Sequence, residues 1–338
     1  MAEPDESAVV ALRSLVNGFQ VSQAISVAAT LGIADLVADG PRTSSDLAAA
    51  TASDPRALHR LLRALAAVGV FIEGDDEQFG LGALGEHLRT DGQLSIAGWA
   101  AYVGSEAYWA AWGNLLHSVR TGETAFVAVH GVDPWLYRST RPEESAVFDR
   151  AMASLTALVS KAVIAAYDFG DFGVVVDVGG GTGAFLADIL ASNPGVRGVL
   201  FDQPHVVSGA PALLSAAGVD TRCEVVGGSF FDFVPDGGDA YVMKAVIHDW
   251  DDERAEAVLR TCRRQLSPSA VLLLVERVLA PPNEGAAGKM SDLNMLVSPG
   301  GQERTLPEFT ALLGRCGFGS VREVPTRGPV SVIEARPV

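Results

Sequence analysis

The feature that most constrains the fold is a glycine-rich turn at residues 176–185 (VDVGGGTGAF), placed between a short apolar run and an amphipathic stretch. From residue 174 onward, short apolar runs alternate with amphipathic stretches. Such alternation is typical of a parallel sheet covered by helices on both faces. Glycines at the first turn let the backbone bend sharply and approach a ligand that a Cβ atom would block. The pattern therefore predicts a doubly wound α/β domain that binds a ligand at the carboxyl ends of its strands.

Five parallel strands are predicted from the apolar runs, at residues 174–178, 198–202, 224–227, 240–244 and 271–276. A last long helix is expected to begin at a capping box, Thr305 to Glu308, and to end near Gly317. Two short strands, 321–325 and 331–336, follow with no helix between them, so they must pair antiparallel. We therefore expect the sheet to finish in an antiparallel hairpin, which is unusual for a dehydrogenase.

The first hundred residues are predicted to form a helical domain of the winged-helix type. Thr43 to Asp46 resembles a capping box, and Asp54-Pro55 is an N-cap followed by proline at the first helical position. Residues 70–81 then predict a short hairpin with a polar tip. Between these features, one buried helix face is expected to consist of Leu58, Leu61, Leu62, Leu65 and Val68.

Winged helices are common in DNA-binding regulators, and the helix expected at 54–69 carries four basic or titratable residues, Arg56, His59, Arg60 and Arg63. The formal net charge is −16, however, whereas nucleic-acid binders concentrate positive charge to neutralise phosphates. DNA binding therefore remains the alternative. We expect instead a homodimer through the apolar stretch 8–37, with no nucleic-acid partner.

Composition excludes other classes of protein. No apolar run approaches the length of a membrane span, and the N-terminus lacks a signal pattern, so no membrane association is expected. The three cysteines have neither disulfide nor zinc spacing, which predicts reduced thiols, a cytoplasmic location and no metal site. Three parts are predicted: a dimerisation domain (1–100), a helical connector that contributes to the substrate pocket (101–165), and a cofactor-binding domain (166–338).

The glycine loop alone leaves two classes of cofactor open. Gly179, Gly181 and Ala184 satisfy the G-x-G-x-x-A pattern of nicotinamide dinucleotide sites. A pyrophosphate at the helix N-terminus would be repelled by Asp177, which lies two residues before the first glycine. Asp177 instead favours a cationic ligand, such as the amino group of a methionine moiety. Asp202, at the end of the second strand, suits ribose hydroxyls in either class, or is a simple turn residue before a proline.

A second loop, GGSFFD at 227–232, follows the third strand, where an adenine would lie. Ser229 could bond the edge of the base and Phe230 could cover its face. An equally acceptable interpretation is a turn that ends the strand, with core phenylalanines.

The candidate base is His248, in the sequence MKAVIHDWDD after the fourth strand. Histidine accepts a proton at neutral pH without a large pKa shift, and open α/β sheets bind ligands at this edge. Glu276 ends the fifth strand, and Glu303 lies in the turn PGGQERT. Either carboxylate could hold the imidazole in the tautomer that leaves one nitrogen free. Glu303 could also merely pair with Arg304 or cap a helix, and His248 could be a packing residue.

Taken together, the motifs VVDVGGGTGAF, GGSFFD, HDWDD and PGGQERT resemble the S-adenosylmethionine-dependent O-methyltransferases of the hydroxyindole and plant phenolic type, and most closely their bacterial antibiotic and polyketide biosynthetic members. The resemblance covers nearly the whole chain. It implies a Rossmann-like methyltransferase sheet with a terminal antiparallel hairpin, preceded by an α-helical winged-helix dimerisation domain. It also implies that His248 is the general base, flanked by Asp249, Glu276 and Glu303.

The same resemblance places S-adenosyl-L-methionine (SAM) against Gly179, Gly180, Gly181, Gly183, Asp202, Gly228, Ser229, Phe230 and Lys244. It places the substrate, a small aromatic natural-product intermediate with a phenolic hydroxyl, against Trp109, Met152, Asn294, Met295 and Ser298. Many relatives have an acid where Ser229 stands, and this departure bears on cofactor affinity. Some proteins of this fold bind SAM yet perform decarboxylation or hydroxylation, and that alternative stays open beside methyl transfer.

Overall fold

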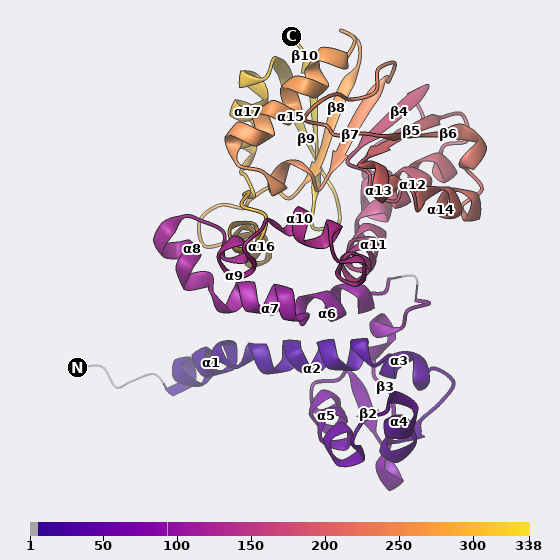
Figure 1. Cartoon of the computed structure of the whole chain (residues 1–338), viewed down its shortest axis with the longest axis vertical. Coiled ribbons are helices and arrows are strands. Elements are labelled where there is room, and N and C mark those ends of the chain that lie inside the picture. The colour runs from indigo at the N-terminus through magenta and orange to yellow at the C-terminus, as the bar shows by residue number, and fades with distance from the viewer. Residues whose placement is uncertain (1–5, 93) are drawn as a thin grey trace. The chain divides into compact units, whose positions relative to one another are not determined.

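The computed structural model describes residues 6–92 and 94–338, which divide into two compact units (Figure 1). Unit 1 holds the residues up to 110 together with 138–155, and unit 2 holds 111–137 and 156–338. Helix α11 (Pro142–Ala166) supplies residues to both units. The segment predicted as a connector is thus shared between the units, and the three-part division drawn from sequence stays a prediction.

Unit 1 contains the expected helices and a small wing. Its hairpin pairs β2 (Phe71–Glu73) with β3 (Gln78–Leu81), and β1 (Arg42–Thr43) adds to the other side of β3, giving the order β1-β3-β2. Its helices up to residue 110 are α1 (Glu6–Val16), α2 (Gly18–Thr30), α3 (Ile33–Leu36), α4 (Ser44–Thr51), α5 (Pro55–Ala67), α6 (Ala97–Val103) and the first part of α7 (Glu106–Gly113).

Local helix signals in unit 1 behave as predicted, with two differences. Asp54 caps α5, and Thr43 caps α4 by accepting from the Asp46 amide. Asp46, however, bonds the Thr43 hydroxyl at 2.7 Å, so the reciprocal bond of a capping box is directed to the side chain. Leu58, Leu62 and Leu65 form the buried face of α5. The prediction for Val68 was wrong: it follows the last turn of the helix and is 43% exposed.

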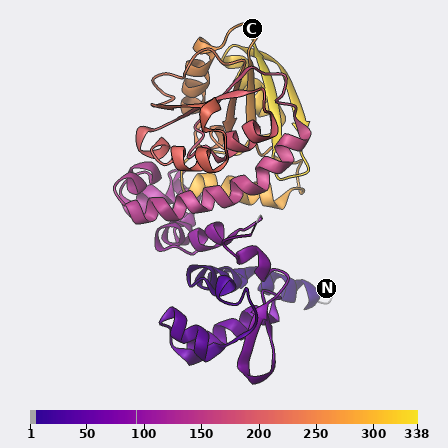
Figure 2. The same ribbon diagram turned by 90° about the vertical axis from the view of Figure 1, so that its right-hand side faces the viewer.

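Unit 2 is built on a seven-stranded sheet in the order β6-β5-β4-β7-β8-β10-β9. Its strands are β4 (Val174–Val178), β5 (Arg197–Asp202), β6 (Cys223–Gly227), β7 (Ala240–Lys244), β8 (Val271–Glu276), β9 (Phe318–Pro325) and β10 (Ser331–Pro337). The first five are parallel, and β10 pairs antiparallel with both β8 and β9. Figure 2 draws β9 and β10 in yellow. This confirms the predicted parallel sheet with its terminal hairpin.

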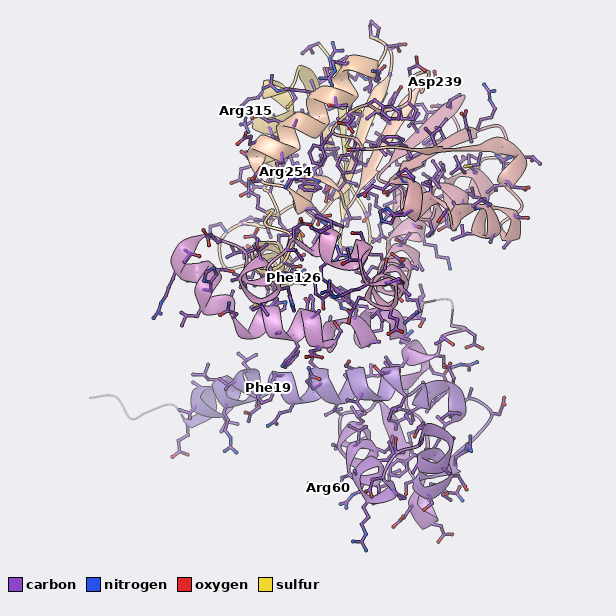
Figure 3. The ribbon with its side chains drawn as sticks, in the orientation of Figure 1. Phe19, Arg60, Phe126, Asp239, Arg254 and Arg315 are labelled. Atoms are coloured by element: carbon purple, nitrogen blue, oxygen red, sulfur yellow. The ribbon has the colours of Figure 1, made fainter. Side chains whose placement is uncertain are left out.

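Helices cover both faces of this sheet. One core packs α15 (Asp252–Gln265) and α17 (Leu306–Arg315) on one face, the side on which Figure 3 labels Arg254 and Arg315. The other core packs α12 (Ala184–Ser192), α14 (Ala210–Ala216) and the end of α11 on the opposite face. The remaining helices are α8 (Leu115–Thr121), α9 (Ala125–His130), α10 (Pro134–Ser139), α13 (Pro204–Val207) and α16 (Ala286–Val297).

The parallel strands bring the predicted motifs to one edge of the sheet. The loops after β4, β5, β6, β7 and β8 all lie at the carboxyl ends of these strands, where ligands of open α/β sheets bind. Within the described ranges 6–92 and 94–338, no helix is both long and apolar enough to cross a bilayer.

Candidate active site

The glycine loop after β4 is tied to β5 by hydrogen bonds. The amide of Gly181 donates to Asp202 Oδ2 at 2.8 Å, and the amide of Gly228 donates to the carbonyl of Asp202 at 2.9 Å. Gly179 has a φ of +72°, and a Cβ there would lie 2.8 Å from Val246 Cγ2, so only glycine fits. The structure thus gathers the glycine loop, Asp202 and the start of the GGSFFD segment into one cradle.

Two charged side chains on one sheet face lie beneath this cradle. Asp177 is fully buried, and neither of its carboxylate oxygens has a hydrogen-bond partner in the described part of the chain. Burial raises the pKa of Asp177 to about 7, an effect opposed by the charge of Lys244 and reinforced by that of Asp202. Burial also lowers the pKa of Lys244, while Asp177 raises it. An unpartnered carboxylate under a glycine cradle fits a ligand with a cationic group.

Ser229 and Phe230 lie in the turn after β6. The Ser229 hydroxyl accepts from the Phe231 amide at 3.2 Å, which is a turn contact of the kind that the plainer interpretation predicted. Phe230 is partly buried, and its ring packs 5.1 Å from that of Phe231 and 6.1 Å from that of Trp250. A Cβ on Gly179 would lie 3.5 Å from the Phe230 ring, so this ring lies next to the glycine loop.

His248 lies in a short 3₁₀ turn (Ile247–Asp249) that follows β7, and it is surrounded by carboxylates. Its Nδ1 is 3.0 Å from Glu276 Oε2 and 3.6 Å from Glu303 Oε2, while Nε2 is 3.5 Å from Asp249 Oδ1. These are ion-pair contacts: among the described residues, Nδ1 and the two glutamate oxygens make no aligned hydrogen bond. The side chain of His248 is 15% exposed, and those of the two glutamates are fully buried. The structure therefore brings all four predicted catalytic residues together.

Backbone and side-chain bonds hold both glutamates in place. Glu276 Oε1 accepts from the amides of Val246 and Ile247 at 3.0 and 2.8 Å, which leaves Oε2 directed at the imidazole. Glu303 Oε1 accepts from the hydroxyl of Ser291 at 2.6 Å. The acid next to Arg304 is Asp252 and not Glu303, so the alternative pairing considered for Glu303 is not formed.

The carboxylates control the charge of the imidazole. Burial alone lowers the pKa of His248, but the negative charge and close contact of Glu276, followed by contacts with Glu303 and Asp249, raise it well above 6.5. Burial raises the pKa of Glu303, but contacts with His248, Ser291 and Arg277 together outweigh this and leave the pKa below its usual value. His248 is thus a stronger base than an ordinary histidine. The three side chains also place potential metal-ligand atoms within 4.8 Å of one another, which the sequence spacing did not suggest.

Sequence reasoning missed two residues that shape this site. Arg304 is 1% exposed and donates to the carbonyls of Ile247 and Trp250 at 3.2 and 3.0 Å, so it fixes the histidine turn from behind. Gly301 lies so close to that turn that a Cβ would collide with the carbonyl oxygen of His248. The only sequence signal for these two residues was the motif PGGQERT, which contains both of them. Their contacts with the histidine turn cannot be inferred from residue spacing.

The predicted substrate residues fall into both units. Asn294 and Met295 lie on α16 and Ser298 follows its last turn; Ser291, on the same helix, contacts Glu303. Residues at i, i+3, i+4 and i+7 share a helix face, so these positions extend from the glutamate along one face of α16. Asn294 Oδ1 accepts from the indole of Trp112 at 3.1 Å. Trp109 and Met152, both partly buried, belong to unit 1.

Comparison with known families identifies the chain. The model of the O-methyltransferase domain matches residues 112–319, and that of the O-methyltransferase dimerisation domain matches residues 13–91. The chain belongs to the O-methyltransferase family. Both the sheet with its terminal hairpin and the N-terminal helical domain are those of this family, as the sequence resemblance implied.

Individual relatives match this methyltransferase over almost its full length. It is 44% identical to phenazine O-methyltransferase PhzM of Lysobacter antibioticus over 100% of both chains. The crystal structure of LaPhzM superposes with a TM-score of 0.94, covering 98% of this chain and 99% of the other. The 8-amino-8-demethylriboflavin N,N-dimethyltransferase of Streptomyces davaonensis is 38% identical over 98% of this chain and 96% of its own.

A third relative has been crystallised with its ligands. The O-methyltransferase NcsB1 of neocarzinostatin biosynthesis, in complex with SAM and 2-hydroxy-5-methyl naphthoic acid, is 36% identical. Its TM-score is 0.80, with 94% of this chain and 96% of that chain covered. The cofactor of the family is SAM, and the cradle described above fits it: positive-φ glycines, an acid on β5 and an unpartnered carboxylate below. The enzyme is a SAM-dependent O-methyltransferase.

Proposed function

We propose that this enzyme methylates a phenolic hydroxyl of a small aromatic natural-product intermediate, with His248 as the general base. The observation that carries the proposal is the Nδ1 contact with Glu276 at 3.0 Å, which directs the other ring nitrogen away from the buried carboxylates. When bound, SAM supplies an electrophilic methyl group on a sulfonium. The chain's part is to hold the acceptor hydroxyl at Nε2 of His248 and to take its proton there.

The raised pKa of His248 supports this role. A phenol near pKa ~10 and an ordinary imidazole near ~6.5 differ by roughly 5 kcal/mol of proton-transfer cost. The buried charges of Glu276 and Glu303 raise the basicity of His248 and so reduce that gap. The same shift means that the proton acceptor form is populated only as pH rises, so methyl transfer should increase through an acid limb placed above 6.5.

Replacement of His248 by alanine tests the base. Loss of a general base lowers transfer to a phenol by about 10²–10⁴-fold, while S-adenosylhomocysteine (SAH) should bind with unchanged affinity in calorimetry. Near wild-type methylation of every hydroxylated aromatic in a substrate panel, with SAH binding intact, would contradict the proposal.

An amine acceptor is the second candidate, because the riboflavin relative is an N,N-dimethyltransferase at 38% identity. A neutral aromatic amine attacks through its lone pair and needs no base before the methyl group moves. Matched phenol and aniline substrates therefore separate the two: the His248→Ala variant should lose the phenol reaction and keep most of any aniline reaction. Equal losses on both acceptors would show that His248 does not act by removing a hydroxyl proton.

We propose that Asn294, Met295 and Ser298, three of the substrate residues inferred from sequence, contact the substrate next to Glu303. Asn294, Met295 and Ser298 continue the α16 face that begins at Ser291, next to Glu303. Trp109 and Met152 are proposed from the resemblance alone. Substitution of Met295 by alanine should change KM across a substrate panel with little effect on SAH affinity, and an unchanged KM for every substrate would count against this assignment.

A homodimer formed by the N-terminal helices is proposed for the whole enzyme. Its support is the match to the dimerisation-domain model and five exposed apolar side chains on α1, those of Val9, Val10, Leu12, Leu15 and Val16. The net charge of −16 supports the further proposal that the winged-helix domain does not serve to bind nucleic acid. Light scattering should give twice the chain mass for wild type and a monomer for a Leu12→Glu/Leu15→Glu variant; a monomeric wild type would overturn the dimer.

A further inference from the structure

Three buried polar atoms of the active site face one another without an aligned hydrogen bond. They are Nδ1 of His248 and the Oε2 atoms of Glu276 and Glu303, and none of them has a hydrogen-bond partner within residues 6–92 and 94–338. The two glutamates are 1% and 3% exposed. A proton on Nδ1 fully satisfies only one of the two oxygens at a time. Buried polar atoms are ordinarily hydrogen-bonded or bound to an ion, so these three call for a shared partner.

The distances between these atoms fit a zinc ion. In a tetrahedral site with Zn–N and Zn–O bonds of about 2.0–2.2 Å, neighbouring ligand atoms lie roughly 3.3–3.6 Å apart. Nδ1 of His248 is 3.0 Å from Glu276 Oε2 and 3.6 Å from Glu303 Oε2. The potential ligand atoms of the three side chains all lie within 4.8 Å of one another. Imidazole and carboxylate both bind Zn²⁺, and three protein ligands leave its fourth position open.

The groups behind these atoms hold them in place, as the outer shell of a metal site does. Oε1 of Glu276 accepts from two main-chain amides just before the histidine, and Oε1 of Glu303 accepts from the Ser291 hydroxyl. Apart from the imidazole, Arg277 is the one cationic side chain within 4.0 Å of either glutamate in the described part of the chain. It contacts Oε1 of Glu303, while Lys244 acts on Glu276 from beyond that distance. The two oxygens that face the ring therefore favour a divalent cation.

We propose that His248, Glu276 and Glu303 form a binding site for Zn²⁺, and that zinc bound there inhibits methyl transfer. The ion takes the lone pair of Nδ1 and displaces any proton from that nitrogen, so the ring keeps its remaining proton on Nε2. Nε2 is the nitrogen proposed to receive the proton of the substrate, and in this state it cannot do so. The zinc site rests on geometry alone, whereas the inhibition rests on the proposed function of His248. The sequence predicted no metal site, since these residues come from separate segments that meet only in the fold.

Calorimetric titration of the full-length enzyme with Zn²⁺, without a histidine tag and after treatment with a chelator, tests the site. One ion per chain should bind to this site in the wild type. Its affinity should fall by at least about 100-fold in His248→Ala and by at least about tenfold in Glu303→Gln, because each variant loses a ligand or its charge. His117→Ala is the matched control: Nε2 of His117 lies 3.6 Å from Glu123 Oε2 in a second histidine–glutamate pair, and its loss should leave this affinity unchanged. A wild type that binds no zinc, or a His248→Ala variant that binds it equally tightly, would overturn the site.

Initial rates of methyl transfer to a hydroxylated aromatic acceptor test the inhibition. Saturating zinc should lower the wild-type rate by at least about tenfold, and excess chelator should restore it. Mg²⁺ at the same concentration should neither bind nor inhibit, because it prefers six oxygen ligands in an octahedral arrangement. Equal inhibition by Mg²⁺ would refute a site of this ligand type. Zinc bound at His248 with no loss of rate would overturn the inhibition together with the proposed base, whereas the calorimetric result for the site would stand, so the two failures are distinguishable.

Discussion

Glu276→Gln is the substitution that most sharply tests how the imidazole is oriented. Glu276 Oε1 accepts from two buried amides, at 3.0 and 2.8 Å, and Oε2 faces His248 Nδ1. A glutamine must place its carbonyl oxygen at one of these positions and its NH₂ group at the other. If the NH₂ group faced the two amides, both buried donors would lose their acceptor, at a cost of about 1–3 kcal/mol each.

This cost fixes the orientation of the glutamine. A penalty of roughly 2–6 kcal/mol corresponds to a preference of at least about 30-fold, so nearly every molecule presents the NH₂ group to His248. Nδ1 must then accept that hydrogen bond, and the ring proton moves to Nε2. The nitrogen proposed to receive the substrate proton is no longer able to do so. In a Ser-His-Asp triad the wrong histidine tautomer costs about 10⁴ in kcat, and we expect a loss of about 10²–10⁴ here.

Glu303→Gln is the matched control. Glu303 Oε1 accepts from the hydroxyl of Ser291, which can rotate to accept as well as donate, and it lies 3.8 Å from Nε of the part-exposed Arg277. No buried amide depends on this oxygen, so the glutamine introduced in this variant can turn its carbonyl toward the imidazole at a smaller cost than in Glu276→Gln. We expect a loss of less than about tenfold in kcat for this variant. The assay is the initial rate of methyl transfer, with SAH affinity and melting temperature as checks on the fold. Equal losses in the two variants, or a Glu276→Gln rate within threefold of wild type, would refute the tautomer argument.

Three further predictions concern backbone fit and buried charge. In Gly301→Ala the new Cβ collides with the His248 carbonyl, so methyl transfer should fall at least tenfold and the melting temperature should drop. Gly314→Ala is the control: it lies in α17 with no neighbour within 4 Å, so the rate should stay unchanged and the melting temperature should hold or rise slightly. Ala245 has a φ of +55°, a backbone conformation that costs an alanine about 1–2 kcal/mol and a glycine almost nothing. Glycine loses more backbone entropy on folding, so the net gain in the free energy of unfolding of the Ala245→Gly variant should be about 0.5 kcal/mol. A loss of stability in denaturant unfolding would contradict this. In the cofactor-free protein burial raises the pKa of Asp177 from 3.8 to about 7, so ionisation of this carboxyl destabilises the fold progressively between about pH 4 and 7. Asp177→Asn should therefore raise the melting temperature more at pH 8 than at pH 5, with a gain in the free energy of unfolding of up to ~4 kcal/mol at the higher pH. An equal gain at both pH values would argue against a buried charge.

The fold was largely predictable because its signals are local. Each parallel strand is an apolar run bounded by polar turns, and the β9–β10 pairing follows from the short connection between them. Thr305 and Glu308 form the capping box that their spacing predicts. Val68 shows the limit of such reasoning: helical periodicity placed it on the buried face, but the helix ends at Ala67 and the periodicity no longer applies.

The sequence was enough to predict that His248, Asp249, Glu276 and Glu303 lie close together, but not the geometry of their contacts. Strand ends placed His248 and Glu276 at the same edge of the sheet, since β7 and β8 are parallel neighbours. Which glutamate lies nearer the ring depends on how two loops pack, and the deciding contacts involve main-chain atoms. Arg304 bonds two main-chain carbonyls, and Gly301 lies against a third main-chain group. Such contacts cannot be predicted from the sequence, because every residue has the same main-chain groups.

Glu276 illustrates why such a site is difficult to alter by single steps. One carboxylate oxygen satisfies the amides that shape the histidine turn, and the other sets the charge of the histidine itself. Glutamine keeps an acceptor for the two buried amides, but it then presents its NH₂ group to the imidazole of His248. A substitution that abandons it, such as alanine, leaves two buried amides without acceptors as well as an uncompensated imidazolium. Structural and chemical demands on this position therefore coincide, and of the ordinary side chains only a carboxylate, with two equivalent acceptors and a charge, meets both at once.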